Sequence, residues 1–89
     1  MNPKISEITI SGRVQGVGFR PFIYNLAKKY NIKGFVTNNE NGVLINAVAD
    51  ESILEVFYDQ IFIQKPISSE ITSSQKKVFH LQKYLMISS

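Results

Sequence analysis

The sequence predicts one α+β domain in which the elements follow the order strand, helix, strand, strand, helix, strand, with a further strand added at the C-terminus. Alternating apolar and polar residues mark the strands, and apolar residues at helical spacing mark the two helices between them. An Asn-Gly pair at positions 41–42 indicates a hairpin between the second and third strands. The 89 residues are enough for one hydrophobic core and too few for two. We therefore expect residues 1–89 to form a single domain.

The first strand is predicted around Ile8-Thr9-Ile10-Ser11, after a loose start over residues 1–4. Ile8, Ile10 and Val14 fall on one face of this strand, while Thr9, Ser11 and Arg13 fall on the other. A half-buried strand of this kind is typical of an antiparallel sheet with helices on one side only. Arg13 then points away from the helices into solvent, and we assign it no role.

A helical pattern from Pro21 to Tyr30 follows. Its apolar stripe comprises Phe22, Ile23, Leu26, Ala27 and Tyr30. Pro21 suits the first turn, where no backbone N–H is needed, and Lys28 and Lys29 complement the helix dipole at the other end. Tyr24, Tyr30 and the phenylalanines are expected to be core residues rather than a stacking platform.

The second strand is predicted at residues 34–38 and the third at residues 43–49. The Asn-Gly pair between them tolerates the positive φ angles of a tight reversal. Alternation places Val36 and Asn38 on one face of the second strand. If Val36 faces the helices, Asn38 therefore lies on the same side, at the strand end near the loop before the first helix.

The second helix is predicted to begin at one of two competing N-caps, Asp50 or Ser52, and to reach about Phe62. Its predicted inward residues are Ile53, Val56, Phe57 and Ile61. Lys65-Pro66 ends the helix.

Two strands are predicted beyond the second helix. Residues 68–78 form a polar, weakly alternating fourth strand, and residues 84–87 form a final strand at the sheet edge. Right-handed crossovers place both helices on one face of the sheet. The predicted fold is thus a ferredoxin-like sandwich, β-α-β-β-α-β, with an antiparallel sheet.

The segment between the first strand and the first helix carries the chemistry. It reads Gly-Arg-Val-Gln-Gly-Val-Gly-Phe-Arg from Gly12 to Arg20. Glycines let backbone N–H groups turn inward, and the helix N-terminus adds positive potential, so the loop suits a phosphate-sized anion. Arg20 can grip the same anion with its planar fork of donors. Spacing alone leaves a second interpretation open, in which the glycines only meet the needs of a turn and Arg20 is solvated.

Several other functions are excluded or disfavoured. The third glycine of the dinucleotide fingerprint is missing, and no Gly-Lys-Ser/Thr follows the loop, which excludes a nucleotide P-loop. There is no cysteine, and the only histidine, His80, has no partner cluster and is expected at the surface, so we expect no metal and no other cofactor. The lysines are scattered and the net charge of +3 is mild, which suits small anionic substrates better than nucleic acid.

The expected location is the cytoplasm. No apolar run is long enough to span a membrane, and the N-terminus lacks the apolar region of a signal peptide. We therefore expect no membrane partner. We also expect a monomer.

Two stretches resemble the signature motifs of the acylphosphatase family. The loop from Gly12 to Arg20 is similar to the first motif, and Gly34-Phe35-Val36-Thr37-Asn38 is similar to the Gly-aromatic-Val-x-Asn second motif at the expected distance. The predicted order of elements agrees over almost the whole chain. More narrowly, Phe19-Arg20-Pro21-Phe22 resembles the N-terminal acylphosphatase-like domain of the HypF-type carbamoyltransferases of hydrogenase maturation, because stand-alone acylphosphatases usually lack that proline.

The resemblance implies hydrolysis of the carboxyl–phosphate bond of acyl phosphates. Carried onto this sequence, it implies that Arg20 binds the phosphoryl group and that Asn38 orients the attacking water. It also implies that backbone N–H groups of the loop cradle the phosphate oxygens, namely those of Gln15, Gly16, Val17, Gly18, Phe19 and Arg20. Without the resemblance, an asparagine before a hairpin is most simply turn chemistry.

Three functions are compatible with the sequence. The first is an active acylphosphatase, either stand-alone or as the excised N-terminal domain of a longer carbamoyltransferase that acts on carbamoyl phosphate. The alternative is a non-catalytic module that binds phosphate or carbamoyl phosphate beside the remaining domains of a carbamoyltransferase. A nucleic-acid module on the same scaffold ranks last. Such modules display aromatic residues on the central strands, where this chain has Ile8, Ile10, Val43 and Ile45.

Overall fold

The structure, a computed structural model, describes residues 3–80. The elements in chain order are β1 (Pro3–Arg13), α1 (Phe19–Lys29), β2 (Lys33–Asn39), β3 (Gly42–Asp50), α2 (Glu51–Gln64) and β4 (Glu70–His80). This order confirms the predicted succession of strands and helices. The final strand predicted at residues 84–87 lies outside the described residues.

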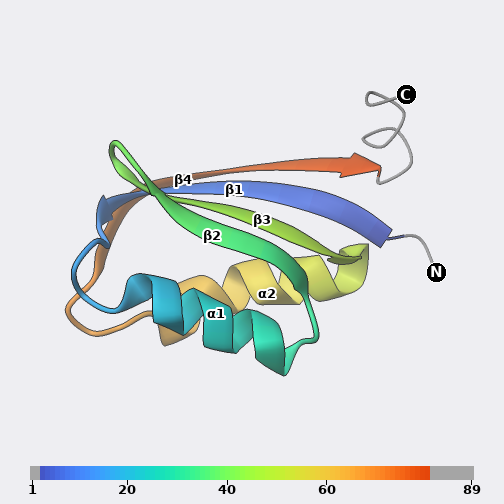
Figure 1. The fold of residues 1–89 in the computed structure, drawn as a ribbon, viewed down its shortest axis with the longest axis horizontal. Coiled ribbons are helices and arrows are strands. Elements are labelled where there is room, and N and C mark those ends of the chain that lie inside the picture. The colour runs from blue at the N-terminus through green and yellow to red at the C-terminus, as the bar shows by residue number, and fades with distance from the viewer. Residues whose placement is uncertain (1–2, 81–89) are drawn as a thin grey trace.

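The four strands form one sheet in the order β2-β3-β1-β4, and each neighbouring pair is antiparallel. Both helices cover the same face of this sheet (Figure 1). The arrangement is the predicted ferredoxin-like α+β sandwich. β1 and β3 are the central strands. The chain leaves β1 at one end of the sheet, passes through α1 and returns to the edge strand β2 (Figure 1).

The core lies between the sheet and the helices. Ile8 and Ile10 are buried on the helix-facing side of β1 and Val14 is buried directly after the strand, as alternation predicts, and Arg13 is exposed. The remaining buried residues of this core are Phe19, Ile23, Leu26, Val43, Ile45, Ala47, Leu54, Phe57 and Ile61. No helix within residues 3–80 is both long enough and apolar enough to cross a membrane.

The first strand starts earlier than predicted. The expected loose start over residues 1–4 is wrong for Pro3 and Lys4, which pair with Asp50 and Ala49 of β3. The reason is that β3 continues to Asp50 and offers a partner to both residues. A 3.0 Å ion pair from the Lys4 Nζ to a carboxylate oxygen of Glu51 closes this end of the sheet.

The inward face of α2 was predicted incorrectly in part. Phe57 and Ile61 are buried as expected, but Leu54 is the third buried residue, whereas Ile53 and Val56 are 36% and 45% exposed. Apolar residues occur on nearly every side of this helix, so the 3.6-residue period did not decide which flank of Phe57 faces the sheet.

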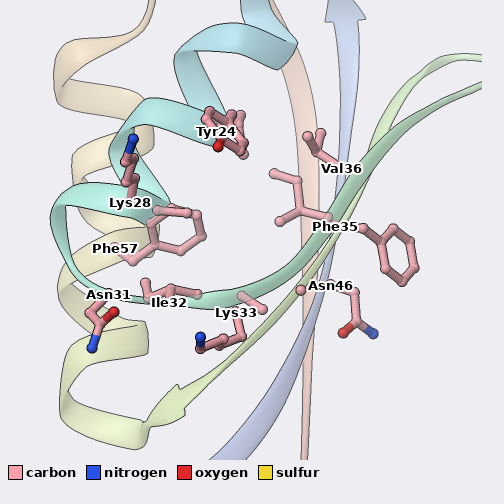
Figure 2. A pocket seen from close by; sticks show the side chains of 14 residues that line it. Tyr24, Lys28, Asn31, Ile32, Lys33, Phe35, Val36, Asn46 and Phe57 are labelled. Atoms are coloured by element: carbon pink, nitrogen blue, oxygen red, sulfur yellow. The ribbon is translucent and has the colours of Figure 1, made fainter.

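Two aromatic residues expected in the core are instead exposed. Tyr24 is 62% exposed on α1, and Phe35 is 56% exposed on β2. Phe35 occupies a strand position that alternates away from Val36, and Figure 2 shows it pointing to the side of the sheet opposite the helices. Tyr30 is partly buried against the core, as expected.

The fourth strand is shifted by two residues from the predicted range, since β4 covers residues 70–80 rather than 68–78. Ser69 accounts for the difference, because it is held in a turn instead of a ladder. Its backbone N–H and its hydroxyl both donate to the carbonyl oxygen of Pro66, at 2.9 and 2.6 Å.

Candidate active site

The loop between β1 and α1 depends on two left-handed glycines. Gly18 is the N-cap of α1 with φ 80° and ψ 20°, and Gly16 has φ 76°. A side chain would meet nothing within 4 Å at either position, so the need for glycine comes from the backbone angles and not from crowding. The two glycines therefore border open space at the start of α1.

The first turn of α1 is unopposed by negative charge. The helix begins at Phe19, two residues before the predicted start at Pro21, so Arg20 stands in its first turn. No acidic residue occurs in this turn, and Gly18 provides no side chain to cap the free N–H groups. The positive end of the helix dipole thus faces the loop, and its own first turn holds no acidic residue to neutralise it.

A cavity of about 150 Å³ lies at this helix end. It brings together Arg20 from α1 and Asn38 from β2, as the interpretation of the sequence predicted. The other lining residues are Val14, Gln15, Gly16, Gly18, Phe19 and Pro21. Val17 does not line the cavity, although it packs against the core.

Arg20 and Asn38 present their polar groups to solvent. Both residues are exposed, and neither side chain has a hydrogen bond or ion pair with another residue in the range 3–80. Asn38 pairs with Val43 near the end of the hairpin, and Val36, two residues earlier, packs against the core. The predicted placement of Asn38 on the helix-facing side of β2 is therefore confirmed.

The side chain of Gln15 joins the loop to the β2–β3 hairpin. Its Nε2 donates hydrogen bonds to the carbonyl oxygens of Asn39 and Gly42, at 2.7 and 2.8 Å. The backbone N–H of Gly12 adds a 3.1 Å bond to the carbonyl oxygen of Asn41. The sequence predicts a role for the backbone of Gln15 but not this side-chain contact, because the pairing of a loop with a distant hairpin leaves no periodic signal.

The only histidine, His80, is exposed at the end of β4, as expected. Within the described part of the chain, no group of three or more His, Asp or Glu side chains is placed to hold a metal ion.

Fold and cavity together define a small α+β domain with a cavity at a helix N-terminus that is lined by the preceding loop, an arginine and an asparagine. The sequence model of the Acylphosphatase family matches residues 6–84. The chain belongs to the acylphosphatase family. An acylphosphatase of Pseudothermotoga lettingae is 49% identical over 72 residues, which cover 80% of this chain and 81% of that protein. This likeness over most of both chains makes the protein a hydrolase of the acylphosphatase type.

Solved structures agree. The crystal structure of acylphosphatase from Bacillus subtilis superimposes with a TM-score of 0.75 at 32% identity, over 85% of this chain and 83% of that one. The crystal structure of full-length HypF in the phosphate- and nucleotide-bound form gives a TM-score of 0.85 at 40% identity, and it covers 91% of this chain but 11% of that one.

The carbamoyltransferase relatives are much longer than this chain. The probable carbamoyltransferase HypF of Methanocaldococcus jannaschii is 44% identical over 65 residues, which are 73% of this chain and 8% of that protein. The resemblance to HypF-type proteins expected from the sequence is therefore confirmed for one domain.

Proposed function

We propose that the chain hydrolyses acyl phosphates with Arg20 binding the phosphoryl group and Asn38 orienting the attacking water. The observation that carries this proposal is that both residues line one cavity at the N-terminus of α1, although they come from different elements. Both side chains lack protein partners among the described residues, so they are available to a ligand.

The phosphoryl group would lie in the loop. Backbone N–H groups between Gln15 and Arg20, together with the dipole of α1, supply positive potential to its oxygens. The guanidinium of Arg20 adds two parallel, charged donors. These groups favour the transition state if the negative charge on the phosphoryl oxygens increases as the reaction proceeds.

The reaction needs positioning more than acid or base. Water attacks phosphorus, the bond between phosphorus and the carboxyl oxygen breaks, and the carboxylate leaves with the electron pair. The side-chain amide of Asn38 can hold the water by donating or accepting a hydrogen bond, but it cannot take the proton. The proton therefore passes to an oxygen of the substrate, which ends as inorganic phosphate. Because a carboxylate is a good leaving group, orientation and charge stabilisation suffice.

Carbamoyl phosphate is the second candidate substrate. The Phe19-Arg20-Pro21-Phe22 run and the similarity to HypF proteins favour it. In that setting the chain corresponds to the N-terminal domain of a longer carbamoyltransferase of hydrogenase maturation, in the cytoplasm, with the remaining domains as its partners. The alternative is a module that holds phosphate or carbamoyl phosphate in the same loop without turnover.

The test is hydrolysis of benzoyl phosphate and carbamoyl phosphate in the presence of a chelator. We expect turnover by the wild-type chain that is lost in Arg20→Gln and retained in Arg13→Gln, a matched change at an exposed arginine outside the cavity. The ratio of the hydrolysis rates of benzoyl phosphate and carbamoyl phosphate distinguishes a stand-alone acylphosphatase from the domain of a carbamoyltransferase. A folded wild-type chain that binds phosphate but hydrolyses neither compound is instead the binding module.

A further inference from the structure

A second, larger cavity lies between α1 and β2 and has no part in the reaction described so far. Its volume is about 340 Å³, within the range of about 300–1,000 Å³ typical of small-molecule pockets. Figure 2 shows Tyr24 and Lys28 of α1 on one side of it and Val36 of β2 on the other. Its apolar lining includes Ile23, Ala27, Ile32, Val36, Ile45 and Phe57.

This larger cavity lies next to the smaller cavity lined by Arg20 and Asn38, which we call the phosphate cavity because the proposed function places the phosphoryl group there. Arg20, Tyr24 and Lys28 are spaced four residues apart and so share one face of α1. Arg20 lines the phosphate cavity, whereas Tyr24 and Lys28 line the larger one. On the opposite wall, Asn38 and Val36 share the helix-facing side of β2. Asn38 lines the phosphate cavity, and Val36 lines the larger one. The two cavities therefore lie end to end between α1 and β2.

The end of the larger cavity that is far from Arg20 is cationic. Lys28 and Lys33 both line it and both are exposed. Among residues 3–80, no carboxylate lines the cavity and neither lysine takes part in an ion pair; the salt bridge in this range joins Lys4 and Glu51. At about 1.5 Å of rise per residue, Lys28 stands about 12 Å along the helix from Arg20. An anion at that distance from the phosphoryl group would meet the positive charges of Lys28 and Lys33.

We propose that the larger cavity is an acyl-group subsite that takes an apolar chain ending in a carboxylate. The proposal rests on the proposed function, because it requires the phosphoryl group to sit beside Arg20. The acyl chain then passes between Tyr24 and Val36, where apolar walls remove its methylene groups from water, and its far carboxylate meets Lys28 and Lys33. The preferred substrates are thus monophosphates of medium-chain dicarboxylic acids.

The test compares kcat/KM for acetyl phosphate, octanoyl phosphate and suberoyl monophosphate. Burial of one methylene group raises kcat/KM by about fourfold. We therefore expect kcat/KM for octanoyl phosphate to exceed that for acetyl phosphate by at least about tenfold, and kcat/KM for suberoyl monophosphate to exceed both. Lys28→Ala should remove the preference of suberoyl over octanoyl phosphate. Lys29→Ala, the matched change at a neighbouring lysine that does not line the cavity, should keep it.

Filling the cavity provides an independent test. Val36→Phe should lower the ratio of octanoyl to acetyl phosphate hydrolysis, whereas Thr37→Phe, the same addition on an exposed position of the opposite strand face, should keep that ratio. If Val36→Phe does not fold, Ala27→Leu places added volume in the cavity from the helix side. Acetyl phosphate turnover with no dependence on chain length overturns the subsite and leaves the proposed function intact.

Binding of the product acids tests the subsite even if no substrate is hydrolysed. Suberate and octanoate should shift the backbone amide signals of Tyr24, Ala27 and Val36 in NMR spectra of the wild-type chain. Weaker suberate binding in Lys28→Ala, with octanoate binding retained, would support the subsite. An absence of shifts in the folded wild-type chain would overturn it.

Discussion

The side-chain amide of Gln15 donates a 2.7 Å hydrogen bond to the carbonyl oxygen of Asn39, the residue that follows Asn38 in β2. A second bond of 2.8 Å from the same nitrogen reaches Gly42 across the hairpin. One side chain from the loop between β1 and α1 is therefore fixed to both strands of the hairpin that carries Asn38. In addition to the pairing of the strands, this contact holds the loop beside the residue that follows Asn38.

Gln15→Ala should lower kcat by about tenfold or more, because a misplacement of about 1 Å between loop and Asn38 is enough to disturb the attacking water. The free energy of unfolding should fall by about 1–3 kcal/mol for the two lost hydrogen bonds. Gln15→Glu should be no better, since a carboxylate cannot donate to two carbonyl oxygens. Steady-state kinetics and urea denaturation measure both effects.

The control is Gln75→Ala, which removes an exposed glutamine of β4 outside the cavity. If Gln15→Ala lost stability but kept its kcat, Gln15 would be a structural residue without influence on the position of Asn38.

Arg20→Lys should reduce kcat/KM by on the order of 10²–10³, the usual cost of losing an oriented transition-state contact. Lysine keeps the charge but offers a point donor in place of the planar fork. Inhibition by inorganic phosphate should weaken as well, and both quantities can be read from one set of kinetic measurements. Arg13→Lys serves as the matched control. Near-normal turnover in Arg20→Lys would remove Arg20 from the proposed phosphoryl site.

The packing of α2 predicts unequal effects for two neighbouring apolar residues. Leu54 is 3% exposed and belongs to the core, so Leu54→Ala should cost about 2–5 kcal/mol in the free energy of unfolding. Val56 is 45% exposed, and Val56→Ala should change stability by about 0.5 kcal/mol or less. Urea denaturation of both variants decides between this face of the helix and the one that the sequence indicated.

The local patterns in the sequence were sufficient for the topology. Alternation in β1 and the Asn-Gly hairpin led to the correct succession of strands and helices, because each depends on residues close together in the chain. The two motifs also placed Arg20 and Asn38 at one cavity correctly. What the sequence did not reveal depends on distant partners. The apolar residues of α2 fit more than one inward face, and the side chain of Gln15 finds its acceptors across the fold.

The role of Asn38 separates catalysis from binding most cleanly. In the proposed mechanism Asn38 contacts the attacking water and not the phosphoryl group, so Asn38→Ala should abolish turnover while inorganic phosphate still binds with nearly unchanged affinity. Stability should change little, because the side chain is exposed and has no hydrogen bond among the described residues. Calorimetric titration with phosphate, beside a turnover assay, measures both quantities on one sample. Loss of phosphate affinity in the folded variant would make Asn38 a phosphate ligand, and the attacking water would then need another residue to hold it.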